Sequence, residues 1–170
     1  MIHDNVQQNQ AVHHENPPRP LGWAPWLLLV ALMLHISEEW SRFPEWATTH
    51  FGTTTTTFYL ISHVPIVALV VWIVARAAQH SPSRRSLFMF TLLLSAFTAN
   101  AAFHLITAIV FSAYSPGIVT GLVLFPALLV FFWPRLRRSL DNRSFFTANL
   151  IGVGASALIA ASLLIDMPAF

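Results

Sequence analysis

Cysteine and lysine are both absent from this chain of 170 residues, and charged residues of all kinds make up only 9% of it. Without cysteine the chain can form neither disulfide bonds nor thiolate metal sites, and it has no cysteine nucleophile. A soluble domain carries about 25% charged residues, so a chain this poor in charge is not expected to be one. The few arginines lie between long apolar stretches, and we therefore predict no nucleic-acid-binding surface.

Hydrophobic residues make up 55% of the chain and are concentrated in stretches long enough to cross a hydrocarbon core of about 30 Å. The predicted fold is all-α: one polytopic membrane helical bundle over residues 21–166, with about five transmembrane spans. We expect these spans at approximately Leu21–Trp40, Phe58–Ala78, Leu87–Ala113, Gly117–Trp133 and Phe145–Ile165. Residues 1–20 are polar and lack the basic start and apolar core of a signal peptide, so we predict a disordered cytoplasmic tail.

Arginine is distributed unevenly between the two sides of this topology. Eight of the nine arginines fall on one side, and only Arg42 falls on the other. The positive-inside rule then places the N-terminus in the cytoplasm. On the opposite side, the connection 41–57 is rich in aromatic residues. It is interpreted either as an apolar connector at the membrane interface or as a lid over a site below it.

Ionisable and amide side chains inside spans are costly and indicate function by default. Here they lie in the outer halves of three consecutive predicted spans: His35, Glu38 and Glu39 in the first, His63 in the second, and Asn100 and His104 in the third. At 100° per residue, each set shares one face of its helix. We therefore predict that the six side chains meet at one depth. The two glutamates have similar angular offsets from His35, so spacing does not distinguish their roles.

Imidazole and carboxylate groups without cysteine suit zinc or non-haem iron. The predicted metal ligands are His35, Glu38, Glu39, His63 and His104. The predicted catalytic groups are Glu38, Glu39 and Asn100, and the predicted substrate-lining residues are Trp40, Phe103, Thr107 and Tyr114. Because the surroundings are apolar, the favoured function is a membrane metalloenzyme, a hydrolase or oxidase, that acts on a lipid or isoprenoid-like substrate from the outer leaflet.

Other functions remain open at this point. Two adjacent glutamates in an apolar pocket cannot both ionise cheaply, so a metal-free isomerase or cyclase could use the pair as acid and base. Intramembrane carboxylates and histidines also build proton- or ion-coupled transporters, and a purely structural polar cluster is the fourth reading. In the fifth span, small residues (Gly152, Gly154, Ala155 and Ser156) suit close helix packing, including packing in a homodimer.

The string His35–Glu38–Glu39 resembles the motif that names the HXXEE family, small bacterial integral membrane proteins that are functionally uncharacterised. The similarity extends to His63, to Asn100 with His104, and to the segment Tyr114–Gly117 followed by Thr120. This resemblance implies a multi-pass protein of the inner (plasma) membrane. It also implies that the polar residues belong to one set, but it names no reaction.

Overall fold

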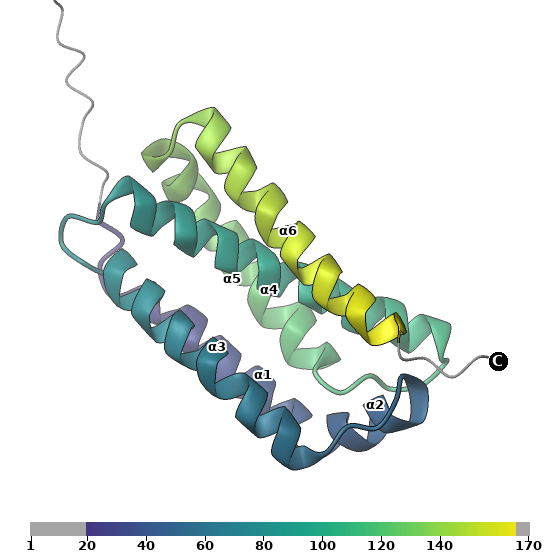
Figure 1. Ribbon diagram of the computed structural model, residues 1–170. Coiled ribbons are helices and arrows are strands. Elements are labelled where there is room, and N and C mark those ends of the chain that lie inside the picture. Colours follow the sequence, from purple (N-terminus) through teal and green to yellow (C-terminus); the bar gives the residue numbers. More distant parts are fainter. Residues whose placement is uncertain (1–19, 166–170) are drawn as a thin grey trace, which may run out of the picture.

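The structure, a computed structural model, describes residues 20–165 and contains only helices in that range (Figure 1). They are α1 (Trp26–Glu39), α2 (Phe43–His50), α3 (Thr56–Ala77), α4 (Arg84–Val110), α5 (Ile118–Ser139) and α6 (Asn142–Ile165). Four of them, α3 to α6, are long and apolar enough to cross a membrane. The prediction of an all-α polytopic membrane bundle is thus confirmed. The predicted tail lies outside the described residues except for its last residue, Pro20.

Helix α1 is shorter than the predicted first span. Its 14 residues extend about 21 Å at 1.5 Å per residue, which is less than the hydrocarbon thickness. The helix begins only at Trp26 because Gly22 has a positive φ of 63° and Pro25 disfavours helical backbone at the residue before it. Leu21 is nevertheless buried in the core, and residues 22–25 before the helix form turns.

The fourth predicted span is longer than expected. Helix α5 continues past Trp133 to Ser139, although Pro126 and Pro134 both lie inside it. Arg135, Arg137 and Arg138 therefore lie in the last turns of a helix, where the helix dipole favours cations. The aromatic connection 41–57 also differs from a loop, because it contains α2, with Pro44 in the first turn, where the missing N–H costs nothing.

Helix α4 is central to the bundle (Figure 1). It packs along α5 and α6 and also contacts α3, while α1 lies between α3 and α5. The start of α1 and the connections α3–α4 and α5–α6 lie at one end of the bundle, and α2 and the connection α4–α5 lie at the other. The arginines of the long helices lie at the first of these two ends, as the positive-inside rule requires. That this end faces the cytoplasm stays a prediction.

The small residues of α6 serve packing within the chain. A Cβ atom on Gly152 would lie 2.3 Å from the main-chain oxygen of Leu92 in α4, and Ser156, one turn later, is buried. A Cβ on Gly154 would meet nothing within 4 Å. The small-residue face predicted from sequence is therefore divided: Gly152 allows α4 and α6 to approach closely, and Gly154 faces outward.

Gly152→Leu is expected to force α6 away from α4 and to lower the free energy of unfolding by about 3 kcal/mol, since overpacking costs about 1–3 kcal/mol and a main-chain carbonyl cannot rotate aside. The matched change Gly154→Leu should alter it by less than about 0.5 kcal/mol, as outward-facing substitutions usually do. Thermal unfolding in detergent, followed by circular dichroism, compares the two. Equal melting temperatures would contradict this close packing.

Candidate functional site

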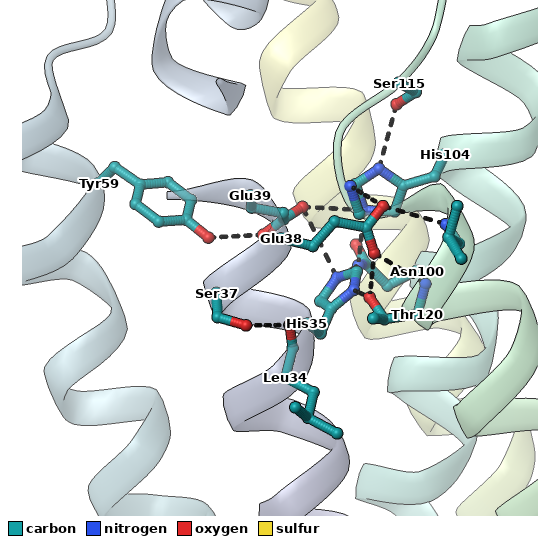
Figure 2. Close-up of polar contacts among 12 residues, drawn as sticks. Leu34, His35, Ser37, Glu38, Glu39, Tyr59, Asn100, His104, Ser115 and Thr120 are labelled. Atoms are coloured by element: carbon teal, nitrogen blue, oxygen red, sulfur yellow. Dashed lines mark hydrogen bonds and ion pairs between the residues drawn. The ribbon is translucent and has the colours of Figure 1, made fainter. Parts of the chain in front are cut away.

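A cluster of buried polar side chains lies close to Phe43 of α2; Figure 2 shows the contacts within it. His35 and Glu39 come from α1, and Asn100 and His104 come from α4, and each pair lies one helical turn apart on one face. The exposed fractions of His35, Glu39 and His104 are 3%, 5% and 1%. One ligand atom from each of these three lies within 4.8 Å of the others. The structure thus brings together four of the six predicted side chains.

Glu39 is the centre of this cluster. Its Oε1 lies 3.1 Å from His104 Nε2 and 3.6 Å from His35 Nε2. Its Oε2 accepts a hydrogen bond of 2.6 Å from the hydroxyl of Tyr59, which is buried in the first turn of α3. Asn100 Nδ2 lies 3.3 Å from His35 Nε2 and 3.2 Å from His104 Nε2. The same two imidazole nitrogens therefore face both a carboxylate and an amide.

Glu38 forms its hydrogen bonds at the start of α5, including those with Thr120 (Figure 2). Its Oε1 accepts hydrogen bonds from the Tyr114 hydroxyl (2.5 Å) and from the main-chain N–H groups of Gly117 (3.1 Å) and Val119 (3.2 Å). Its Oε2 accepts from the N–H (2.8 Å) and the hydroxyl (2.5 Å) of Thr120. The carboxylate caps the N-terminus of α5, where free N–H groups and the helix dipole favour an anion. Glu38 was predicted as a metal ligand, but it is not among the three side chains whose ligand atoms converge.

His63 also lies outside the ligand group. Its Nδ1 is 2.7 Å from the main-chain oxygen of Tyr59, one turn earlier in α3, and the two rings are 4.2 Å apart. Helix α3 therefore contributes Tyr59, and not His63, to the contacts of Glu39. Tyr59 was not among the site residues predicted from the sequence. The tyrosine–histidine pair one turn apart was the signal that could have found it.

The Nδ1 atoms of the two clustered histidines contact hydroxyl groups of the segment that leads into α5. His35 Nδ1 is 3.0 Å from Thr120 Oγ1, and His104 Nδ1 is 3.1 Å from Ser115 Oγ. Thr107 Oγ1 lies 3.1 Å from the same Ser115 oxygen. Spacing could not reveal these contacts, because they join different helices. Only the resemblance to the family pointed to Ser115 and Thr120.

The four predicted substrate-lining residues have different surroundings. Thr107 is buried in the hydroxyl network, and the Phe103 ring lies 5.4 Å from the ring of His104. Trp40 and Tyr114 are about half exposed. Partial burial and the hydrogen bond to Glu38 raise the pKa of the Tyr114 hydroxyl to about 12, so this group remains a donor at neutral pH.

Aromatic rings close the cluster on two sides. From α2, the Phe43 ring lies 6.2 Å from the ring of His104 and 5.7 Å from that of Tyr59. From α5, the fully buried Phe125 ring lies 5.3 Å from that of His35. Helix α2 thus covers the cluster, which favours the lid interpretation of the aromatic connection. A groove of about 360 Å³ beside it is lined by Leu34, Ser37, Glu38, Val119, Thr120, Val123 and Leu124.

Comparison with known proteins identifies a family. The model of a family described as "Protein of unknown function with HXXEE motif" matches residues 26–132. This range extends from the start of α1 to the last turns of α5 and includes every residue of the cluster. No curated protein and no solved structure matches the chain.

Proposed function

Because the chain belongs to the HXXEE family, whose function is unknown, we propose its function from the site: it is a membrane metalloenzyme that binds a zinc or iron ion through His35, Glu39 and His104. The substrate that we propose is lipid-like or isoprenoid-like. In this proposal the protein is a multi-pass protein of the plasma membrane, and its site faces the non-cytoplasmic half of the bilayer.

The observation that carries the proposal is the convergence of hydrogen-bond acceptors. Asn100 Nδ2, which can only donate, faces Nε2 of both His35 and His104, so each Nε2 presents a lone pair. The same two atoms face the carboxylate oxygen Oε1 of Glu39 at 3.6 and 3.1 Å. Each Nε2 has one lone pair, so a bound ion would take the place of the Asn100 N–H groups there and would hold the two nitrogens and Oε1 together without the mutual repulsion of three acceptors.

The donor set fits a metal ion. Two imidazole nitrogens and one carboxylate oxygen are the protein ligands of many catalytic zinc sites and of non-haem iron sites, which keep a position open for water or substrate. With metal–ligand bonds of about 2.0–2.1 Å, the ligand atoms of a tetrahedral site lie about 3.3 Å apart. The observed separations from Glu39 Oε1 of 3.1 and 3.6 Å agree with this value.

An ion bound at this point would act as a Lewis acid and lower the pKa of a bound water. Tyr59 holds the Glu39 carboxylate in place by donating to Oε2. Asn100 provides an amide that can orient a polar group of the substrate. Phe43 and Phe125 exclude bulk water. The helices around the site present apolar side chains outward, which suits an apolar substrate that enters from the lipid.

A proton in place of the metal ion defines the second candidate function. His104 Nε2 and Glu39 Oε1 are within hydrogen-bond distance at 3.1 Å, so a shared proton would also relieve their repulsion. The protein would then be an acid–base isomerase or cyclase that uses Glu39 with His104. The adjacent glutamates would not form the acid–base pair, because the Glu38 carboxylate has its own five donors at α5.

Metal analysis of protein purified without chelators tests the two candidates. We expect about one zinc or iron ion per chain in the wild type and less than about a tenth of that amount in His35→Ala and in His104→Ala, since each change removes a ligand. The control His63→Ala should retain the ion, because His63 contacts the main chain of its own helix. A folded wild-type protein that takes up neither zinc nor ferrous iron would refute the metal site and favour the acid–base function.

A further inference from the structure

We infer that Glu38 is a positioning residue that acts through Thr120: it holds His35 in the neutral tautomer with the proton on Nδ1, so that the lone pair of Nε2 faces Glu39. The two glutamates of the motif then have separate roles, one in the cluster and one behind it. The inference concerns the same site and rests on the proposed function only for its effect on metal affinity. The tautomer itself follows from contacts within the chain.

The donor and acceptor of each hydrogen bond can be assigned in turn, starting from Glu38. Three main-chain N–H groups at the start of α5 point to its carboxylate, which favours the anion, and an anion can only accept. The Thr120 hydroxyl has one proton, and it donates this proton to Glu38 Oε2 at 2.5 Å. Toward His35 Nδ1, at 3.0 Å, the same oxygen can therefore only accept. His35 Nδ1 must carry a proton, and in a neutral imidazole Nε2 then carries none.

The opposite side of the imidazole agrees with this assignment. Asn100 Nδ2 is a donor with two protons, and it lies 3.3 Å from His35 Nε2. The side-chain amide can turn to present its oxygen instead, so this contact agrees with a lone pair on Nε2 but does not fix it. Thr120 at Nδ1 is thus the partner that selects the tautomer, and Asn100 at Nε2 follows it.

His104 provides an internal comparison. Its Nδ1 faces the Ser115 hydroxyl at 3.1 Å, and Ser115 in turn contacts the Thr107 hydroxyl. A hydroxyl that contacts another hydroxyl can either donate or accept, so no charged group fixes its direction. The contact at Nδ1 therefore fixes the tautomer of His35. The contact at Nδ1 of His104 does not fix its tautomer, which depends instead on Asn100 and Glu39. Groups that hydrogen-bond to a metal-binding side chain commonly change metal affinity by about 10–100-fold.

Nitrogen NMR of ¹⁵N-histidine-labelled, chelator-treated protein tests the inference, with the His35 signals assigned from His35→Gln. In the wild type we expect His35 to be protonated on Nδ1 and not on Nε2. Thr120→Val keeps the shape of the side chain but removes the acceptor, and the form protonated on Nε2 should rise to at least about half of the population. Thr120→Ser should restore the wild-type signals. The control Thr98→Val should not change them, because this hydroxyl binds the main-chain oxygen of Leu94.

Two results would overturn the inference: a wild-type His35 protonated on Nε2, or a Thr120→Val protein with an unchanged tautomer. The second result would leave Glu38 as a helix cap only. Glu38→Gln should shift the tautomer as Thr120→Val does; if this variant does not fold, the valine and serine variants decide alone. Zinc titration separates the two proposals, since a tautomer shift in a protein that never binds zinc or iron sustains the inference and refutes the metalloenzyme.

Discussion

Gly117→Ala is expected to abolish metal retention and to lower the free energy of unfolding by about 2–5 kcal/mol. Gly117 has a φ of 93°, which costs an L-residue about 1–2 kcal/mol. A Cβ there would also lie 2.7 Å from Glu39 Oε1 and 2.7 Å from His35 Cε1, and overpacking of this kind adds about 1–3 kcal/mol. Because both contacts belong to proposed ligands, relief of the clash must displace the site itself.

Gly22→Ala is the matched control for this prediction. Gly22 also has a positive φ, 63°, but a Cβ at this position would meet nothing within 4 Å. It should therefore show the backbone cost alone, about 1–2 kcal/mol, and keep the metal ion. Melting temperature and metal content are measured on both variants. If Gly117→Ala kept the ion and the stability of the Gly22 variant, the close approach of α5 to the cluster would be wrong.

Glu39→Gln is expected to lower zinc affinity by at least about 100-fold while leaving the bundle folded, because loss of a direct ligand should exceed the effect of an outer partner. Glutamine has nearly the same size and can still accept the hydrogen bond from Tyr59. The loss of zinc affinity would therefore be due to removal of the negative charge beside His35 and His104. Glu45→Gln, a change at an exposed position of α2, is the control for removal of one carboxylate. Titration against a chelator of known affinity measures both.

The outcome that contradicts this second prediction is an unchanged zinc affinity in Glu39→Gln. Such a result would move the ion to other ligands or remove it from the function. A moderate loss in Tyr59→Phe, about tenfold, would further show that the orientation of the carboxylate matters, since Tyr59 acts only through Oε2.

Helical periodicity is the reason that part of the site could be predicted from the sequence. His35 with Glu39 and Asn100 with His104 are each four residues apart, so each pair shares a helix face wherever the helices lie. Burial of the two faces against each other then follows, since exposure of these groups to lipid would be costly. The structure places these four side chains together, as periodicity and cost predict.

The separation of the two glutamates could not be predicted in the same way. Glu38 and Glu39 have similar offsets from His35 around the helix, and their partners decide between them. Glu38 meets the start of α5, about 80 residues later in the chain, and this contact is a tertiary one. His63 was misjudged for a related reason: its Nδ1 contacts the main chain of its own helix, an interaction that neither depth nor spacing reveals.

The separate positions of the two carboxylates have a consequence for electroneutrality. In the proposed metal site, where both imidazoles would be neutral ligands, Glu38 and Glu39 contribute two negative charges. The N–H groups at the start of α5 stabilise the charge of Glu38, whereas the carboxylate of Glu39 is buried between His35 and His104. A divalent cation at the proposed site would offset this buried charge, which matters because uncompensated charge in an apolar medium costs several kcal/mol. Release of such an ion should therefore be accompanied by uptake of a proton.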